Sequence, residues 1–175
     1  MSLVVRRARA SDVENIVALL GPYIERGELL PRDPSEISGT IDHWVVAIEG
    51  NKLLGCGSLV AYSDELSEVR SLAVVPGYRG MGIGRALMEM LVEVARGVGV
   101  RRLFGLTRVV PFFIQSGFAS IDIVEIPEKV WRDCAPCPLR DRCDEHPVML
   151  VLSNQRPGRQ AVPADGRGGN RNVPK

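Results

Sequence analysis

Three closely spaced glycines, at positions 80, 82 and 84, separate an apolar run from an amphipathic pattern. The stretch is SLAVVPGYRGMGIGRAL, with Arg79 and Arg85 on either side of the glycines. A dinucleotide fingerprint, G-x-G-x-x-G, would need a glycine where Arg85 stands, and the chain has no Gly-Lys pair to form a P-loop. These two phosphate-binding motifs are therefore excluded, and the loop predicts a third kind of phosphate site.

The other patterns predict a mixed α+β domain. Short apolar runs predict strands at 4–8, 43–49, 52–62, 67–75, 101–107, 119–126 and 147–152. Helical spacing predicts helices at 11–20, where Ser11 and Glu14 have capping-box spacing, and at 84–97 and 109–116. The glycines then lie between a strand and the helix that follows it, inside one β–α–β unit.

The tail from Ser153 onward differs in composition from the rest of the chain. It carries five Lys or Arg and one Asp, a net charge of +4, while the preceding 152 residues carry −3. Its Gly, Pro, Asn and Arg residues show no apolar periodicity, which predicts disorder. We expect one domain over 1–152, containing a cysteine-bearing insert at 127–146, and a disordered basic tail over 153–175. A solvated tail is favoured over weak contact with nucleic acid, so no nucleic-acid partner is expected.

The apolar runs HWVVAI and VMLVL are far too short to span a bilayer. The N-terminus has charges after a short apolar stretch and no cleavage-type segment. We therefore expect a cytoplasmic protein with no membrane partner.

The glycine loop resembles the pyrophosphate-binding signature of the GCN5-related N-acetyltransferases (GNAT), R/Q-x-x-G-x-G/A, carried here by Arg79, Gly82 and Gly84. The resemblance covers roughly residues 3–152. It implies a central mixed, twisted sheet with helices on both faces, and acetyl-CoA as co-substrate. Independently, glycine backbones and a helix N-terminus suit a pyrophosphate. The expected cofactor-binding residues are Leu72, Ala73, Val74, Val75, Arg79, Gly80, Met81, Gly82, Ile83, Gly84 and Arg85.

The resemblance also implies a splayed strand before the loop, whose backbone pairs with the pantetheine arm. The matching segment is 72–75. The N–H of Val74 is expected to hydrogen-bond the thioester carbonyl and to stabilise the oxyanion that forms there.

The stretches LLPRD, EVRSLAV and FFIQSGF, among others, are similar to the acetyltransferase domain of the bacterial N-acetylglutamate synthases, here in a stand-alone form. This implies acetyl transfer to the α-amine of an amino acid, above all L-glutamate, in arginine biosynthesis. It implies Glu68 as general base, Thr107 as the acid for the leaving thiolate, and Arg32 as a substrate-carboxylate ligand. Arg70, on the same strand face as Glu68, is a second cation for a dicarboxylate. A merely structural role stays open for each residue.

One departure from the relatives affects the acceptor. The chain has Glu145, His146 and Pro147 where they carry an Arg-Asn-Ser-like stretch, which reverses the local charge. Transfer to another amine, such as a protein N-terminus, and a non-catalytic acetyl-CoA-binding sensor stay open as alternatives. A small amino acid is the expected partner, and a homodimer is one assembly that we consider.

The insert contains WRDCAPCPLRDRCDEH, which spaces Cys134, Cys137, Cys143 and His146 as C-x2-C-x5-C-x2-H. These residues could supply a structural zinc site, and the three thiolates alone could hold an iron–sulfur cluster. The second gap is shorter than in common zinc fingers. A disulfide is disfavoured in a reducing cytosol. Cys56, between two glycines, is expected to pack in the core.

Overall fold

A computed structural model describes residues 2–153 of the 175-residue chain. The strands are β1 (Leu3–Arg7), β2 (Trp44–Glu49), β3 (Lys52–Ala61), β4 (Leu66–Val74), β5 (Arg102–Thr107), β6 (Ala119–Ser120) and β7 (His146–Val151). The helices are α1 (Val13–Glu25), α2 (Pro34–Gly39), α3 (Ile83–Gly97), α4 (Val110–Gln115) and α5 (Pro127–Lys129), which continues into a π-helical turn, Val130–Cys134. Apart from Ser153, the predicted tail lies outside the described residues.

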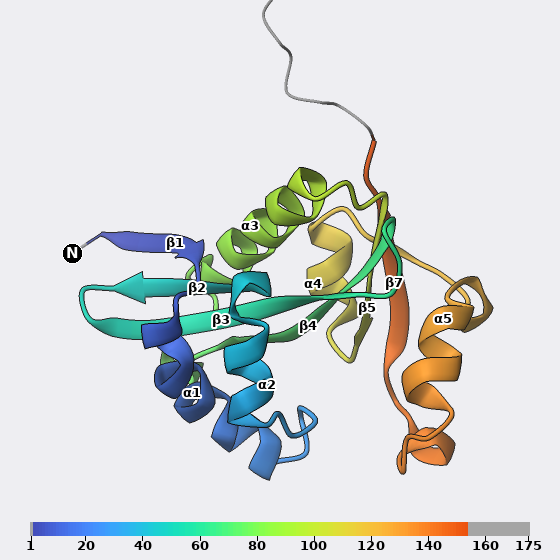
Figure 1. Ribbon diagram of the computed structural model, residues 1–175, viewed down its shortest axis with the longest axis horizontal. Coiled ribbons are helices and arrows are strands. Elements are labelled where there is room, and N and C mark those ends of the chain that lie inside the picture. Colours follow the sequence, from blue (N-terminus) through green and yellow to red (C-terminus); the bar gives the residue numbers. More distant parts are fainter. Residues whose placement is uncertain (1, 154–175) are drawn as a thin grey trace, which may run out of the picture.

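The seven strands form one mixed sheet in the order β1-β2-β3-β4-β5-β7-β6. The β4 and β5 strands are parallel, and the other neighbouring strands are antiparallel. Figure 1 shows α1 and α2 on one face of the sheet, α3 and α4 on the other, and α5 beyond β7. This arrangement confirms the predicted fold class, a mixed sheet with helices on both faces.

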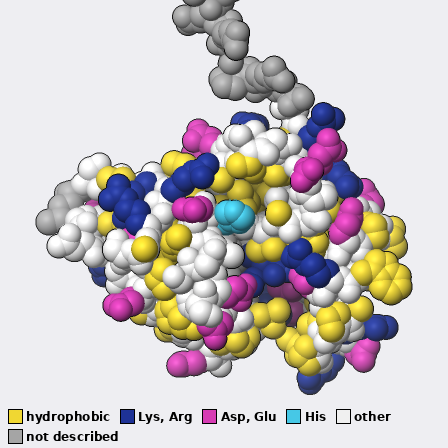
Figure 2. Space-filling model, in the orientation of Figure 1, with side chains coloured by type: hydrophobic (Ala, Val, Ile, Leu, Met, Phe, Trp, Pro, Cys, Tyr) yellow, Lys and Arg dark blue, Asp and Glu magenta, His cyan; other side chains and the backbone are white. Residues whose placement is uncertain are grey.

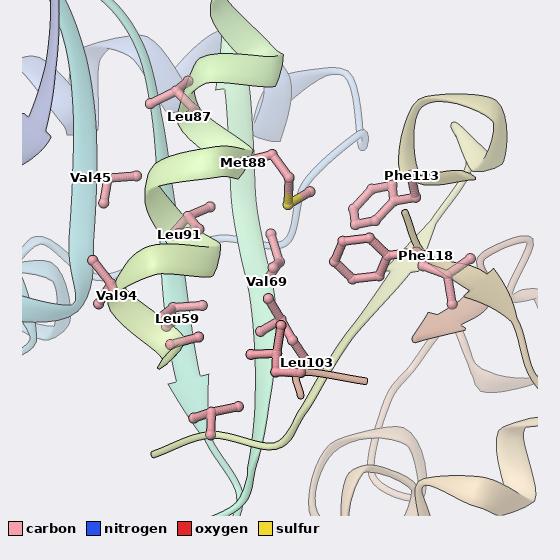
Figure 3. Packing of buried hydrophobic residues seen from close by; sticks show 14 of the residues in the cluster. Val45, Leu59, Val69, Leu87, Met88, Leu91, Val94, Leu103, Phe113 and Phe118 are labelled. Atoms are coloured by element: carbon pink, nitrogen blue, oxygen red, sulfur yellow. The ribbon is translucent and has the colours of Figure 1, made fainter. Parts of the chain in front are cut away.

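Helix α3 packs on the sheet through one apolar face. Leu87 and Leu91 are fully buried, and Figure 3 shows both directed at the strands beneath them. Two glycines in β3 make this close approach possible. A Cβ atom at Gly55 would lie 2.8 Å from Cδ1 of Leu87, and one at Gly57 would lie 3.0 Å from Cδ1 of Leu91. Side chains on these two positions would push the helix off the sheet.

The opposite face is covered by α1 and α2. Ile16 and Leu20 of α1 and Ile37 of α2 pack with Trp44 of β2 in a second buried cluster. Tyr23, one turn further along α1, belongs to the same cluster and is 5% exposed. The apolar spacing in 13–20 therefore has the expected cause, a helix face buried against the sheet.

Strands β4 and β5 pair over only three residues and then separate. The last pair is Glu68 with Phe104, after which β5 continues to pair with β7 on its other side. A register shift between Cys56 and Ser58 marks a bulge between β3 and β4, and Ser71 opposite it has a φ of 52°. Because a bulge bends and twists a strand, it helps to turn β4 away from β5. The result is a fork in the sheet, with Glu68 where it opens.

Two sequence expectations about local structure were wrong. The predicted strand at 119–126 is only two residues long, because Asp122 ends it. The Asp122 carboxylate accepts a hydrogen bond from the Val124 N–H at 3.1 Å and starts a 3-10 turn. Helix α1 also continues past Pro22 to Glu25, beyond the predicted end at Leu20.

Asp12 stabilises the 3-10 turn Ala10–Asp12 that leads into α1, and the expected capping box of Ser11 and Glu14 does not form. The Asp12 carboxylate accepts from Arg6 at 2.7 Å and 3.0 Å, and from the Arg9 N–H at 2.7 Å. Asp12 is 5% exposed, so a buried ion pair anchors α1 to the edge strand β1.

This ion pair predicts an acid-sensitive contribution to stability. The hydrogen bonds from Arg6 hold the pKa of Asp12 below its usual range, although burial opposes them. A lowered pKa stabilises the fold above the unfolded value of about 4, and this contribution is lost as the pH falls through the folded value. We expect Asp12→Asn to be less stable than the wild type at pH 7, and the difference to shrink below about pH 4. Urea unfolding at several pH values measures this, and a difference that persists at pH 2 would contradict it.

Candidate functional site

The glycine loop lies between the end of β4 and the N-terminus of α3. Gly80 and Gly82 have φ angles of 79° and 82°, in the left-handed region that glycine tolerates best. A Cβ atom at either position would meet no described atom within 4 Å. Gly84 has a different role, because a Cβ there would lie 3.3 Å from Cε2 of Phe112 in α4. Two glycines shape an open loop, and the third allows α3 to pack against α4.

The N-terminus of α3 is suited to an anion. Gly82 is the residue that caps the helix, and no side chain of residues 2–153 accepts the hydrogen bonds of the first turn. These N–H groups have no partners within the helix, and the helix dipole places partial positive charge beside them. The loop can therefore present several backbone donors to a phosphate group.

The two arginines beside the loop point to different places. Arg79 donates from Nη2 to the hydroxyl of Tyr23 at 2.9 Å, and Tyr23 donates in turn to the carbonyl oxygen of Val74. Arg85 pairs with Glu89 at 2.9 Å along α3, and its side chain is 79% exposed. Arg79 is therefore tied to the end of β4, while Arg85 lies at the surface of the helix.

The contacts of Val74 and Val75 show which way their backbone groups point. The N–H of Val75 donates to the carbonyl of Leu54, in β3, at 2.8 Å. Because successive residues of a strand direct their backbone groups to opposite sides, the N–H and C=O of Val74 face away from β3. They therefore face the fork. The Tyr23 hydroxyl donates to the Val74 carbonyl oxygen there, and the Val74 N–H points to the same side.

Glu68 is buried at the point where the fork opens. It is 3% exposed and accepts hydrogen bonds from Nε of Arg70 at 2.5 Å and from the Tyr62 hydroxyl at 2.8 Å. Nζ of Lys129 lies 3.1 Å from both of its carboxylate oxygens. Asp133 accepts from the same three groups, at 3.1 Å in the case of Lys129. We call these five residues the Glu68 cluster.

Shifted pKa values in the cluster follow from burial and charge. Burial and the neighbouring Glu68 carboxylate raise the pKa of Tyr62 well above its usual range, so its hydroxyl stays protonated. Burial disfavours the charged form of Asp133, but the Tyr62 hydrogen bond and the Arg70 charge outweigh it and hold the pKa of Asp133 well below its usual range. The cluster thus contains the Arg70 guanidinium, an ionised Asp133 and a hydroxyl donor.

Thr107 ends β5 on the other arm of the fork. It is 5% exposed, and its Oγ1 accepts a hydrogen bond from the Val109 N–H at 2.9 Å. The hydroxyl proton itself is left to donate to another acceptor. Glu68 and Thr107 therefore lie on the two strands that border the fork.

Arg32 is not part of the Glu68 cluster. It pairs with Glu36 of α2 at 2.5 Å, and its side chain is 15% exposed. A second arginine, Arg108, connects two loops beside the fork. It donates to Asp144 at 2.6 Å and to the carbonyl of Glu28 at 3.1 Å. Arg108 also lies 3.8 Å from Glu145, so a cation balances the negative charge that the sequence departure introduces.

The cysteines of the insert do not form the expected metal site. Among residues 2–153, no group of three or more His, Cys, Asp or Glu side chains is placed to hold a metal ion. Cys134 ends the π-helical turn, Cys143 is exposed, and His146 begins β7 opposite Thr107. The donors present therefore do not fit zinc in this arrangement. Cys56 is buried as expected, and burial raises its pKa to about 12, which makes this thiol a poor nucleophile.

Sequence reasoning did not select Lys129, Asp133, Tyr23 or Arg108. No motif in the sequence selects Tyr62 either. The four-residue spacing of Lys129 and Asp133 is compatible with one helix face, but it gave no sign of a partner 61 residues away in β4. These residues are brought to the fork by the path of the chain.

Figure 2 shows a recess between the side of the molecule that carries α2 and the side that carries α5, with basic and acidic side chains gathered in it. Three features of this site are typical of acyltransferases that take an acyl-CoA thioester, and they define that class of protein. They are a forked pair of parallel strands, a loop suited to an anion at the start of the helix between those strands, and a buried carboxylate where the fork opens.

The chain belongs to the acetyltransferase (GNAT) family, whose family model matches residues 14–118. It is 38% identical to an uncharacterized N-acetyltransferase of Chlorobaculum tepidum over 148 residues, 85% of this chain and 96% of the relative. It is an acetyl-CoA-dependent N-acetyltransferase of the GNAT type, as the sequence resemblance implied.

Other similar proteins are named for amino-acid acetylation. An amino-acid acetyltransferase of Mycobacterium tuberculosis is 35% identical over 131 residues, 73% of this chain and 75% of the relative. N-acetylglutamate synthase of Neisseria gonorrhoeae, solved with coenzyme A and N-acetyl-glutamate, is 26% identical with a TM-score of 0.74. The match covers 87% of this chain but 36% of the synthase, and only 28% of the longer enzyme of Salmonella typhi is spanned.

No helix in residues 2–153 is both long enough and apolar enough to cross a membrane.

Proposed function

We propose that this protein transfers the acetyl group of acetyl-CoA to the α-amine of an amino acid, and that L-glutamate is its acceptor. The observation that carries the proposal is the buried Glu68 carboxylate at the fork, beside the two cations Arg70 and Lys129. A carboxylate there can take a proton from an ammonium group, and the cations suit an acceptor that also carries carboxylates.

The residues that would hold the co-substrate follow the fork. The loop at Gly80 and Gly82, with the first N–H groups of α3, suits the pyrophosphate. The free backbone edge of 72–75 suits the pantetheine arm, because its groups on the fork side have no β5 partner. Acetyl-CoA supplies an activated acetyl thioester when it is bound.

Three residues then contribute to the steps of the reaction. Glu68 takes a proton from the acceptor ammonium, so that the neutral amine nitrogen can bond to the thioester carbon. The N–H of Val74 donates to the carbonyl oxygen as it gains negative charge, a role worth ~3 kcal/mol where one donor has been removed in other enzymes. The C–S bond breaks as the amide forms. The Thr107 hydroxyl donates a proton to the leaving thiolate and takes up the second proton that the attacking nitrogen loses, so Thr107 ends unchanged, and Glu68 later releases the first proton to solvent.

Support for glutamate comes from the relatives and from charge. The Mycobacterium tuberculosis and Neisseria gonorrhoeae proteins carry the names of amino-acid acetyltransferase and N-acetylglutamate synthase. Arg32 and Arg108, outside the Glu68 cluster, are further cations that a side-chain carboxylate could contact. Our proposal includes that this activity serves the entry to arginine biosynthesis.

The test is mass spectrometry of the products formed from acetyl-CoA and an equimolar mixture of the twenty amino acids. We expect N-acetylglutamate as the dominant product. A different dominant N-acetyl amino acid would overturn the choice of glutamate but keep the reaction class. Binding of coenzyme A without any acetylated amino acid would overturn the proposed activity and favour the sensor alternative. Thiol-reactive dyes are unsuitable, because the chain has four free cysteines.

We expect Tyr23→Phe to weaken coenzyme A binding about twofold to tenfold, the effect of one lost hydrogen bond. The Tyr23 hydroxyl links Arg79 to the carbonyl of Val74, so it holds the loop and the end of β4 together. Calorimetric titration with coenzyme A measures this. Tyr78→Phe is the matched control, because within residues 2–153 the one hydrogen bond of the Tyr78 hydroxyl is with the surface residue Lys52, at 3.2 Å. Equal effects of both changes would contradict the prediction.

A further inference from the structure

Three hydrogen-bond donors converge on one oxygen atom of Asp133. Tyr62 and Nη2 of Arg70 contact Oδ2 of Asp133, and Nζ of Lys129 lies 3.1 Å from the same atom. Two of the donors come from the sheet side of the fork, and Lys129 comes from the insert. The convergence of a guanidinium, an ammonium and a hydroxyl is a built cradle for one carboxylate.

The charges of the cluster show that this cradle requires an anion. Among the described residues, Glu68 is the one other carboxylate in ion-pair contact with both Arg70 and Lys129 when Asp133 is left out. The side chains of Glu68 and Lys129 are 4% and 8% exposed, so an unbalanced positive charge there is costly. Asp133 is the most exposed of the four charged groups, at 27%. It therefore balances the buried charge from the solvent side.

The distance between the carboxylates of Asp133 and Glu68 suits the spacing of the ammonium and carboxylate groups of a free amino acid. Both carboxylates lie within hydrogen-bond distance of the Tyr62 hydroxyl, which can donate its one proton to either, so their nearest oxygens lie within about two hydrogen-bond lengths, or 6 Å. An α-amino acid carries its ammonium and its carboxylate on one carbon atom. An ammonium beside Glu68 would thus place the carboxylate of the same molecule near the oxygen that Asp133 now occupies.

We propose that Arg70, Lys129 and Tyr62 form the subsite for the acceptor's α-carboxylate, and that Asp133 is an internal stand-in that the acceptor displaces. The proposal rests on the proposed function, and it narrows the substrate class to free amino acids. A polyamine has no carboxylate for the cradle, and a protein N-terminus has a neutral amide there. The insert thereby contributes both a ligand for the acceptor, Lys129, and a competitor for it, Asp133.

The test is calorimetric binding of L-glutamate and of its α-amide to the protein saturated with coenzyme A. The α-amide keeps the amine and the side-chain carboxylate and lacks only the α-carboxylate. We expect the wild type to bind glutamate at least about tenfold more tightly, because the amide leaves the cradle without its anion. Equal affinities would overturn the proposal, and this comparison needs no altered protein.

Two variants test the roles of the insert residues. Asp133→Asn removes the competing charge and should tighten glutamate binding about fivefold, with little effect on the α-amide. Lys129→Met should weaken glutamate binding and abolish the preference over the α-amide. Asp141→Asn is the control, since Asp141 is an exposed aspartate of the same insert. Thermal unfolding shows whether the Asp133→Asn variant is folded. If the folded variant binds glutamate with the affinity of the control, or more weakly, Asp133 is not a stand-in.

Binding and turnover separate the two proposals. Selective binding of glutamate without any acetylated product would retain the carboxylate subsite and overturn the proposed activity. Acetylation of glutamate and its α-amide with equal KM values would retain the activity and overturn the subsite.

Discussion

Replacing Glu68 by glutamine is expected to lower kcat/KM for acetyl transfer by about 10²- to 10⁴-fold, the usual contribution of a general base. Glutamine has nearly the same shape and can still accept hydrogen bonds from Arg70 and Tyr62. It cannot take the proton of the acceptor ammonium. Steady-state rates, with the product quantified by mass spectrometry, measure the effect.

The pH dependence distinguishes a base from a structural carboxylate. As the pH rises, the acceptor loses its proton to solvent and no longer needs Glu68. The deficit of Glu68→Gln should therefore shrink at alkaline pH. A constant deficit between pH 7 and pH 9 would indicate that Glu68 only positions its neighbours, and near wild-type activity in the folded variant would contradict both roles.

Two controls distinguish the loss of the general base from an effect of Glu68→Gln on folding. Loss of the Glu68 charge leaves Asp133 as the one carboxylate of the described residues in ion-pair contact with Arg70 and Lys129, so the fold itself could weaken. Coenzyme A affinity should stay nearly unchanged, because among residues 2–153 no hydrogen bond or ion pair joins the glycine loop to the cluster. Glu68→Asp, which keeps the charge and moves it back by one methylene, should retain more stability than Glu68→Gln and part of the activity.

The largest expected effect on stability comes from Leu91→Ala. Leu91 is fully buried in the middle of α3, where its Cδ1 closely approaches Gly57 of β3. Removing a buried leucine costs about 2.7–5 kcal/mol, because the apolar transfer energy is lost and a cavity remains. For a domain of this size we expect the melting temperature to fall by about 5–20 °C.

The matched control on the same helix is Val98→Ala. Val98 is also apolar but is 63% exposed, at the C-terminal end of α3. Its removal should change the free energy of unfolding by no more than about 0.5 kcal/mol. Urea unfolding of both variants measures the difference. Equal losses would mean that α3 does not depend on its buried face.

Much of the fold followed from local patterns. The apolar positions of α3 recur with helical spacing because one face of the helix is buried, and the strands of the central sheet appeared as short apolar runs. The strand expected at 119–126 was wrong because a single side chain, Asp122, ends it by capping a turn. The apolar periodicity of a sequence indicates which residues are buried. It does not indicate where a side chain such as that of Asp122 forms a hydrogen bond with the backbone and ends a strand.

The candidate site also has one part that the sequence predicted and one part that it did not. The glycine loop was evident because a left-handed backbone demands glycine at fixed spacing just before a helix. The four-ligand metal site was a reasonable expectation from spacing, but spacing along the chain does not fix where side chains point. Among the described residues, the donors do not gather.

The sequence by itself determined the loop, the helix behind it and the strand that carries Glu68, because each depends on residues close together in the chain. Only the tertiary structure decided what surrounds Glu68. Lys129 and Asp133 join its cluster from more than 60 positions away, because the chain turns after β6 and brings the short helix α5 and the turn that follows it to the side chains of β4. A contact of this kind leaves no periodic trace in one sequence, since the two partners are related only through the path of the backbone between them.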